Sequence, residues 1–523
     1  MMRKNAQIRI PGSKIPRPIH NIMANWSGYI FSATITFFLT PFVVQHLGST
    51  GYGIWTLLTS LTGYLGLLDL GVRGTVTRYI ARFHAQADHN EASRVTASAL
   101  VVFAVSGSLA VLISVILAAF AVDAFNMPDE FKSAAKTVFV VAGFTAGVSL
   151  VSGVFGGVIA GLQRFGLLNM IENFSGVLRA LAIVMMLSHG YGLQALALIH
   201  LAFSVLNGLA YGIASRRLYP ELSFRLKDSS RSHLRMILSF SAYLFILNVS
   251  NLLIFYTDTM IIGAFLSVSM ITFFAIAGTL MNQARVILRG ITTAMTPLAS
   301  SLDARISYAG LQSTHLRVSR YATMVIAPIL VTFMLRGESF INLWMGDEYG
   351  ELSGRVLFIL ALALLLTTGN HVSASIMVGM GRHKGMVPIA VGEALCNLLL
   401  SILLVQSWGV EGVAWGTAIP NIAFGILFWP WYIRRTLGVS IRTYLSSIWL
   451  RPGTALILFA LASAYIEKFW PATNLVLFFS QVAMVLPLAL VSYWWICFDS
   501  AERQSIRFRL WHPSIEPQRI NTE

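Results

Sequence analysis

Charged residues are scarce in this sequence, and that scarcity bounds its class. Lysine, arginine, aspartate and glutamate make up 11% of the 523 residues, whereas hydrophobic residues make up 56%. A soluble protein of this length normally carries about 25% charged residues. The deficit recurs along the whole chain, which excludes a soluble globular protein and predicts an all-α polytopic membrane protein.

Cysteine is almost absent as well. The two cysteines, Cys396 and Cys497, lie far apart in apolar surroundings, and no metal-ligand spacing or disulfide framework is present. The basic N-terminal stretch also lacks the short apolar core and small-residue cleavage site of a signal peptide. We therefore expect no cofactor, no metal site and no cleaved signal.

Long hydrophobic runs are what the sequence does contain. About fourteen of them reach the length of roughly 20 residues that a membrane-spanning helix needs. They cover residues 24–44, 51–71, 96–122, 134–160, 166–188, 191–213, 238–263, 270–295, 320–335, 355–377, 386–407, 411–433, 448–466 and 473–497. The ninth is the weakest of these predictions, because Pro328 and the nearby Arg336 shorten it.

The basic residues predict how these spans are oriented. The net charge of +15 would suggest a nucleic-acid partner for a soluble protein. Here the lysines and arginines gather in every second connection, so membrane orientation explains them, and no nucleic acid is expected. An even number of spans with both termini in the cytoplasm follows. The opposite connections are short, and the longest, from Arg336 to Gly354, is acidic.

An internal repeat divides the chain. The run GLQRFGLLNM from Gly161 to Met170 is similar to GMGRHKGMVP from Gly379 to Pro388, and YGLQALAL from Tyr191 is similar to WGVEGVAW from Trp408. Landmarks in matching order predict two pseudo-symmetric six-helix lobes, related by an axis along the membrane normal. The predicted parts are a cytoplasmic tail (1–20), a first lobe (21–220), a linker (221–237), a second lobe (238–435), two further helices (436–498) and a second cytoplasmic tail (499–523).

Polar residues form stripes on four of the predicted spans. Residues three or four apart, or seven apart, share one face of a helix. The stripes are Ser241, Asn248, Asn251 and Asp258 in one span; Asn282, Arg285, Arg289, Thr292 and Thr296 in the next; and Thr59, Thr62, Gly66, Asp69 and Arg73 in the second span, with a weaker one of Asn25, Ser32 and Thr36 in the first. Such stripes predict a water-filled cavity between the lobes. The alternative is that Arg285 and Arg289 only extend toward lipid headgroups.

Four acidic residues fall within predicted spans: Asp69, Glu172, Asp258 and Glu393. Each is costly there unless paired or protonated. The functional interpretation is that one or more of them exchanges a proton or a sodium ion. In the structural alternative, Asp69 pairs with Arg73, Glu172 pairs with Arg179, and a neighbouring Asn or Thr caps Asp258.

Several segments resemble the bacterial polysaccharide flippases, the oligosaccharide-lipid branch of the superfamily that also holds the MATE multidrug exporters and the lipid II flippase. The resemblance rests on Pro41, on the run from His46 to Arg82, on Tyr256 to Leu280 and on Ile291 to Ala304. It covers nearly the whole chain. Its motifs distinguish this family from unrelated transporters but do not distinguish one sugar substrate from another.

The resemblance implies a V-shaped, two-lobed bundle in the bacterial inner membrane. It would carry an undecaprenyl-diphosphate-linked oligosaccharide to the outer leaflet by alternating access, for O-antigen, capsule or exopolysaccharide, alongside polysaccharide assembly proteins. Arginine suits such cargo because it stays ionised and holds phosphate oxygens in a fork. We expect Arg285 and Arg289 to hold the diphosphate, Arg73 and Arg78 to collect cargo at the inner mouth, and Asn248, Asn251, Asn282, Thr59 and Thr62 to bind the glycan. The last two helices would form a groove for the lipid tail.

Three other functions compete with this interpretation. A MATE-type drug exporter needs acidic and aromatic residues for cationic cargo, whereas the predicted cavity is mostly basic. A glycan polymerase or ligase needs catalytic groups on a long outer loop, and we find neither such a loop nor a nucleotide-binding or nucleophile motif. A passive structural protein leaves the polar stripes unexplained. We therefore expect a transporter rather than an enzyme.

Overall fold

The computed structural model describes residues 17–504, except residues 121, 123, 124, 126, 240, 241 and 305. Every regular element in this part of the chain is helical. The first group is α1 (Arg17–Gly63), η1 (Tyr64–Asp69), α2 (Val72–Ala85), α3 (His89–Phe120), α4 (Asp129–Gly161), α5 (Phe165–Ser188) and α6 (Leu193–Leu218). The second is α8 (Ala242–Phe265), α9 (Val268–Thr292), α10 (Met295–Ala304), α11 (Tyr308–Met345), α12 (Asp347–Gly379) and α13 (Val387–Leu437). Short elements η3 (Leu226–Asp228) and α7 (Arg231–Ser239) link them, η4 (His383–Met386) precedes α13, and α14 (Ile441–Leu445), η5 (Ser446–Leu450), α15 (Arg451–Ala455), α16 (Ile457–Phe469) and α17 (Leu475–Ile496) follow it.

The membrane-spanning helices cover the predicted ranges, although the predicted count of about fourteen spans is not confirmed. Within the described residues, 11 helices are long and apolar enough to cross a membrane, or 12 if the two parts of α8, bent by 42°, form one span. Two of these, Phe31–Ala85 and His383–Leu437, are 55 residues long and each hold two predicted ranges. Each of the fourteen predicted ranges falls largely on a described helix.

Glycines divide the two longest helices. Gly48 in α1 and Gly409 in α13 have φ values of +67° and +56°, a conformation that L side chains rarely adopt. In α13 the halves lie side by side, because Asn397 Nδ2 donates to Thr417 Oγ1 at 2.8 Å and Asn421 Nδ2 donates to Glu393 Oε1 at 2.7 Å. Such pairing across Gly409 makes α13 an antiparallel helical hairpin.

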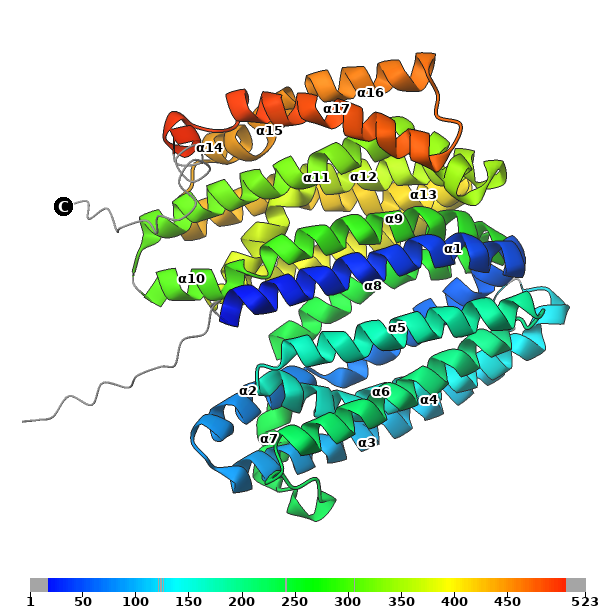
Figure 1. The fold of residues 1–523 in the computed structure, drawn as a ribbon, viewed down its shortest axis with the longest axis vertical. Helices are drawn as coiled ribbons and strands as arrows, with labels where there is room; N and C mark the ends of the chain where they lie inside the picture. Colours follow the sequence, from blue (N-terminus) through cyan, green and yellow to red (C-terminus); the bar gives the residue numbers. More distant parts are fainter. Residues whose placement is uncertain are drawn as a thin grey trace, which may run out of the picture.

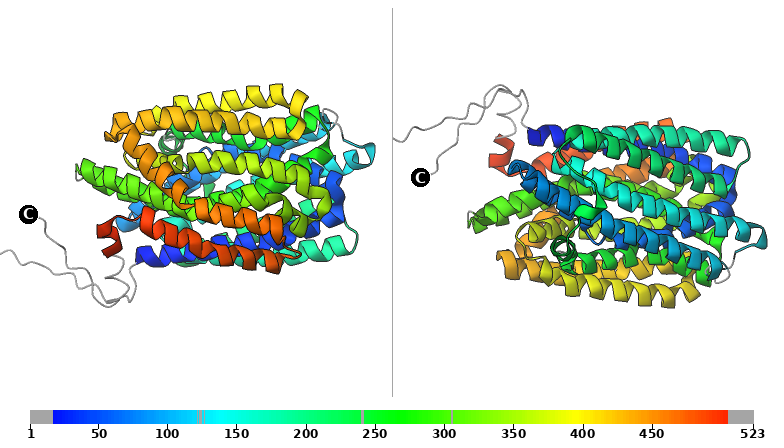
Figure 2. Two further views of the ribbon diagram at one scale, coloured as in Figure 1. Left: turned by 90° about the horizontal axis from the view of Figure 1, so that it is seen from above. Right: turned by 90° about the horizontal axis from the view of Figure 1, so that it is seen from below.

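The long helices run nearly parallel and form two lobes (Figures 1 and 2). We call α1–α6 the N-lobe and α8–α13 the C-lobe; α14–α17 cover the outer side of α11. The end that carries α2, α7, α10 and the last described residues is called the base, and the opposite end the far end (Figure 1). The six-plus-six arrangement with additional C-terminal helices agrees with the prediction, while the residue boundaries given for its parts stay a prediction.

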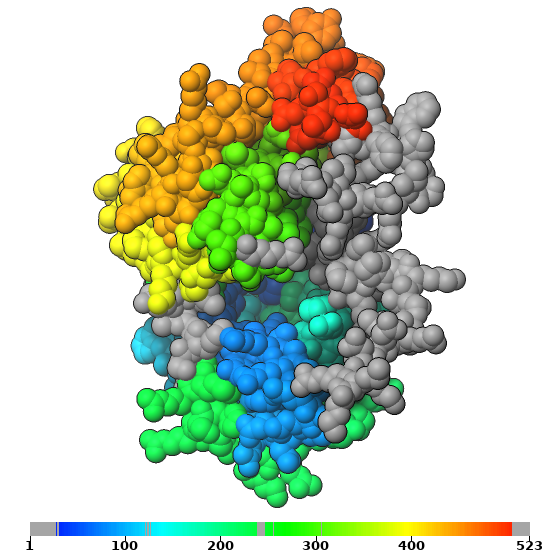
Figure 3. Space-filling view, turned by 90° about the vertical axis from the view of Figure 1, so that its left-hand side faces the viewer, coloured from blue at the N-terminus to red at the C-terminus, as the bar shows by residue number. Residues whose placement is uncertain are grey.

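The lobes touch at the far end and separate at the base. Gly53 of α1 packs directly against the carbonyl oxygen of Val268 at the start of α9, and Thr272 Oγ1 donates to the Ser49 carbonyl at 2.5 Å. Trp344 Nε1 also donates to the Phe37 carbonyl at 2.8 Å. At the base, the molecular face is hollowed between the lobes (Figure 3). The described conformation is therefore closed at the far end and open at the base.

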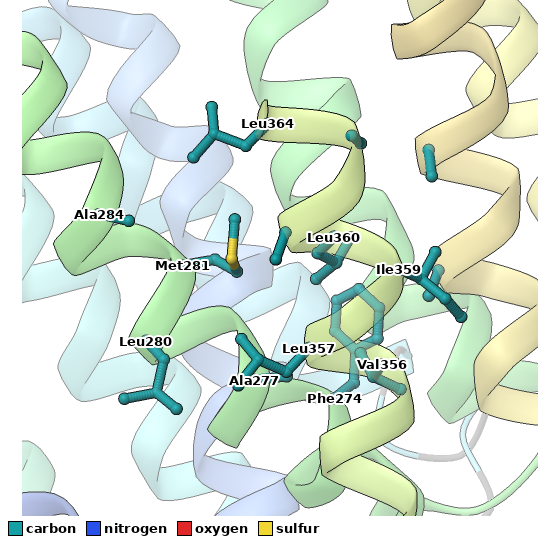
Figure 4. Close-up of a cluster of buried hydrophobic side chains, with 14 of the residues drawn as sticks. Phe274, Ala277, Leu280, Met281, Ala284, Val356, Leu357, Ile359, Leu360 and Leu364 are labelled. Atoms are coloured by element: carbon teal, nitrogen blue, oxygen red, sulfur yellow. The ribbon is translucent and has the colours of Figure 1, made fainter. Parts of the chain in front are cut away.

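Close packing within the C-lobe holds its helices in place. Apolar side chains of α9 and α12, including Met281 and Leu360, interdigitate in the largest buried cluster (Figure 4). Tight interiors of this kind transmit displacement rather than absorb it. Within the C-lobe, this packing fixes α9 against α12.

The region around Arg336 differs from the prediction. The helix α11 continues through Pro328 and Arg336 to Met345, and only Gly346 separates it from α12. There is accordingly no loop from Arg336 to Gly354. Arg336 is 1% exposed, its Nε lies 2.6 Å from Glu467 Oε2 of α16, and its Nη2 lies 2.5 Å from Gln481 Oε1 of α17. Arg336, expected in a loop, instead forms a buried ion pair that holds the C-terminal helices against α11.

Candidate functional site

A polar cavity of about 840 Å³ lies inside the N-lobe. It is lined by α1, α2, α4, α5 and α6 and is partly open. Gly28 of α1 and Arg73 of α2 both line this cavity. Between them the chain runs to the far end and turns back at Gly48. The polar lining residues are Ser32, Thr36, Arg73, Thr77, Thr145, Ser149, Ser152, Asn169, Glu172, Asn173, Arg179, His200, Ser204, Asn207 and Tyr211.

Charged groups toward the base of this cavity have partners. The Tyr211 hydroxyl donates to Glu172 Oε1 at 2.9 Å. Arg73 Nε lies 3.8 Å from Asp69 Oδ2, the pairing expected in the structural alternative. The described partner of Glu172 is thus Tyr211 rather than Arg179. Tyr211 belongs to α6, which packs beside α5 and brings its hydroxyl to the Glu172 carboxylate.

The deeper part of the cavity contains Arg179 and His200. The two side chains interact electrostatically, and the His200 ring lies 5.3 Å from the Trp55 ring. Among the described residues, none accepts a hydrogen bond from the Arg179 guanidinium. A charged side chain within a membrane span and without an acidic partner is a candidate for ligand contact.

A second group of basic residues lies in the C-lobe. Arg289 Nη2 donates to Asn282 Oδ1 at 3.2 Å, which shows that these two residues share one face of α9 as predicted. Arg285 on the same helix interacts electrostatically with Arg289, and His371 of α12 interacts with both arginines. Asn282, Arg289 and His371 are exposed although they belong to the interior helices of the lobe. Such accessibility is typical of side chains that line a cavity.

Asp258 forms the centre of an oxygen-rich group behind these arginines. The side chain is 3% exposed, and its Oδ2 accepts from Thr417 Oγ1 at 2.7 Å. Ser401, whose hydroxyl donates to the Val413 carbonyl at 3.4 Å, lies near the carboxylate, and Arg285 interacts with the carboxylate electrostatically. Asp258 Oδ1 and Asn397 Oδ1 are buried and, within the described part of the chain, have no hydrogen-bond partner.

Glu393 lies one helical turn from this group. Its Oε1 accepts from Asn421, whose Oδ1 accepts from Thr367 Oγ1 at 3.0 Å. The carboxylate is therefore part of the polar contact between the halves of α13 and α12. No group of three or more His, Cys, Asp or Glu side chains with metal-binding geometry occurs among the described residues.

The other predicted residues are placed as follows. Thr59, Asn248 and Asn251 are exposed and Thr62 is half-buried, whereas Thr292 is buried. The hydroxyls of Thr59 and Thr62 donate to backbone carbonyls of their own helix, and so does the amide of Asn251. Arg78 lies on the exposed side of α2 at the base. Ser241 lies outside the described residues, and so does the side chain of Asn25.

The predicted site residues divide between the two lobes, and the single central hollow expected for them stays a prediction. Arg285, Arg289 and Asn282 lie together in the C-lobe, while Arg73 and Glu172 line the N-lobe cavity. Sequence reasoning named Arg179 only as a partner for Glu172, and it missed the N-lobe residues His200 and Asn207. The signal was present: His200, Ser204, Asn207 and Tyr211 recur at helical spacing on one face of α6. It also missed the partner of Asp258, because Thr417 is distant in sequence.

Comparisons with known proteins give consistent matches. Residues 19–303 match a family described as "Polysaccharide biosynthesis protein". A Shigella flexneri protein named as an O-antigen transporter is 21% identical over 80% of this chain and 98% of its own length. A Haloferax volcanii protein named as a low-salt glycan biosynthesis flippase is 21% identical over 75% of this chain and 78% of its own.

Two solved structures share the fold. The lipid II flippase MurJ in an inward closed conformation covers 94% of this chain and 99% of its own, with a TM-score of 0.70 and 14% identity. An inward-facing multidrug resistance MATE family transporter covers 79% of this chain and 98% of its own, with a TM-score of 0.67 and 17% identity. At these identities the likeness shows the fold alone.

Proposed function

Since the chain belongs to the polysaccharide biosynthesis protein family and acts as a polysaccharide flippase, we propose that its cargo is an undecaprenyl-diphosphate-linked oligosaccharide. The observation that carries this proposal is the pair Arg285 and Arg289. Two permanently ionised guanidinium groups on one face of α9, beside His371, match the charge and fork geometry of a diphosphate. A cationic drug would be repelled there, which disfavours the exporter alternative.

The two-lobed shape supports alternating access. Cargo would enter through the opening at the base and leave after the contact at Gly53 separates. The base carries the basic helix ends, including Arg216, Arg217 and Arg434, so we place it in the cytoplasm, with both termini. The direction is then from the inner to the outer leaflet of the inner membrane.

The lipid tail can remain outside the cavity. An apolar groove of about 240 Å³ lies between α11, α12 and the elements η5, α15 and α16. Its lining includes Ala327, Leu365, Trp449 and Leu456. A groove of this composition suits a polyprenyl chain, whose transfer from water is favourable at about 25 cal/mol per Å² of apolar surface.

A gene deletion tests the cargo. Loss of the protein is expected to abolish surface polysaccharide and to accumulate the lipid-linked oligosaccharide in the inner leaflet. Mass spectrometry of the lipid fraction and immunodetection of surface glycan measure both effects. Normal surface glycan in the deletion strain, with no second copy of the gene, would contradict the proposal.

Asp258 is our candidate for coupling transport to an ion gradient. Its carboxylate and the oxygens of Asn397, Thr417 and Ser401 come from α8 and both halves of α13. Two of these oxygens are buried without partners, which fits an oxygen-liganded cation such as sodium, and also fits a proton on Asp258. Because α8 and α13 meet at this group, occupancy would change how tightly they pack.

Replacement of Asp258 with asparagine is expected to remove the dependence of export on the ion gradient. Binding of radioactive sodium to the purified protein should weaken at least about tenfold, because the one charged ligand is lost. Thr417→Val, which keeps the side-chain shape, should weaken it less. Glu221→Gln, an exposed change at the base, serves as the control. Normal export by Asp258→Asn, with unchanged dependence on pH and sodium, would exclude Asp258 as the coupling residue.

A further inference from the structure

We infer that the deep part of the N-lobe cavity is a separate site for a monoanionic sugar, with Arg179 holding its carboxylate. This inference rests on the proposed function, because the sugar would belong to the transported glycan. It assigns to the N-lobe a role in selecting cargo by charge, distinct from the diphosphate site in the C-lobe.

Arg179 lies deep in the membrane-spanning part of the N-lobe. It lies in the second half of α5, about 20 Å along the helix axis from Phe165, and so deep within the bilayer. Its guanidinium stays ionised, is half-buried, and among the described residues donates to none. A charge within a membrane span and without an acidic partner is costly, and an oxyanion held in a bidentate fork would offset that cost.

The lining of the cavity that contains Arg179 suits a sugar. Asn173, Ser149, Ser204 and Asn207 line the same cavity and offer neutral donors and acceptors for hydroxyl groups. Ser149 and Ser204 already exchange a hydrogen bond at 2.9 Å across α4 and α6. The whole cavity, of which the deep part is one end, has a volume of about 840 Å³, within the range of about 300–1,000 Å³ common for small-molecule sites.

Charge balance favours a single carboxylate over a diphosphate. The deep part has one unpaired guanidinium, whereas the C-lobe group has two arginines. Glu172 lies on the same face of α5, about 10 Å toward the base, and its carboxylate would repel a group of higher negative charge. The N-lobe cavity therefore matches a uronic-acid-type sugar, and the C-lobe group matches the carrier diphosphate.

Thiol protection on the purified full chain in nanodiscs tests the site. A Ser204→Cys variant is labelled by a water-soluble thiol reagent in the presence of glucuronate, glucose or pyrophosphate. The native cysteines do not line the cavity, and the unsubstituted chain measures their background. Glucuronate should slow labelling, while glucose at the same concentration should not. If Ser204→Cys does not fold, Asn207→Cys reports on the same cavity.

Arg179 variants decide whether the guanidinium is responsible. Arg179→Gln should raise the glucuronate concentration needed for protection at least about tenfold, and Arg179→Lys should raise it less. The exposed variant Arg434→Gln controls for general loss of positive charge. Absence of glucuronate protection, or protection unaffected by Arg179→Gln, would overturn the site. Protection by pyrophosphate equal to that by glucuronate would overturn its assignment to a sugar.

This binding assay requires no transport. Glucuronate binding in a protein that fails to move lipid-linked glycan would leave the site intact and refute only the proposed cargo. Export of lipid-linked glycan without glucuronate protection would refute the sugar site and leave the proposed cargo intact. The two proposals can therefore fail separately.

Discussion

Replacement of Arg285 with alanine is expected to abolish polysaccharide export. The change removes a permanent charge and a two-pronged donor from the C-lobe group, where Arg289 and His371 are its electrostatic neighbours. Hydrogen bonds to charged groups contribute about 1.5–3 kcal/mol each, so loss of two predicts at least about a hundredfold weaker cargo binding. Arg285→Lys keeps the charge without the fork, and we expect an intermediate loss of about tenfold.

Surface glycan at equal protein level measures this effect. The matched control is Arg434→Ala, which removes an exposed arginine at the base end of α13. Gel filtration of the purified variants confirms that each one folds. Full export by Arg285→Ala would remove this residue, and with it the charge argument for a diphosphate, from the mechanism.

Replacement of Gly53 with alanine is expected to open the far end. A Cβ atom at this position would overlap the carbonyl oxygen of Val268, which is backbone and cannot rotate away. Overpacking of this kind costs about 1–3 kcal/mol, so the far-end-closed population should fall roughly 5- to 150-fold relative to the alternatives. Export should fall too, because the transport cycle needs the seal to form.

Spin labels at the exposed far-end positions Lys136 and Glu351 measure the lobe separation. Gly53→Ala should lengthen and broaden the distance distribution. Gly278→Ala is the control, since a Cβ there meets open space on α9. An unchanged distribution in Gly53→Ala, together with normal export, would show that the contact with Val268 is not a gate.

The helical architecture was predictable because it depends on local properties of the sequence. Hydrophobic length predicts spans, and helical spacing placed Asn282 and Arg289 on one face, where they now share a hydrogen bond. The prediction of a loop after Arg336 was wrong for a related reason. A buried partner, Glu467, lies far away in sequence and makes an arginine inside a helix tolerable.

The sites were only partly predictable because they join distant segments. Asp258 could be recognised as an unusual acidic residue, but its partners Thr417 and Asn397 come from a hairpin that only packing defines. The polar face of α6 was visible in the sequence, but the N-lobe cavity also depends on small residues of α4, such as Gly153 and Gly156, whose effect on the available space appears only after packing. The polar stripes indicated which helix faces contact water or polar groups, but they did not indicate which helices pack against one another.

Reconstitution tests the central claim most directly. Purified protein is placed in liposomes with a short-chain polyprenyl-diphosphate oligosaccharide confined to one leaflet, and an impermeant glycosidase reports when glycan reaches the other. We expect transfer that depends on the protein and is lost in Arg285→Ala. Transfer no faster than in protein-free liposomes, with folded protein and an imposed sodium or proton gradient of either direction, would contradict the account.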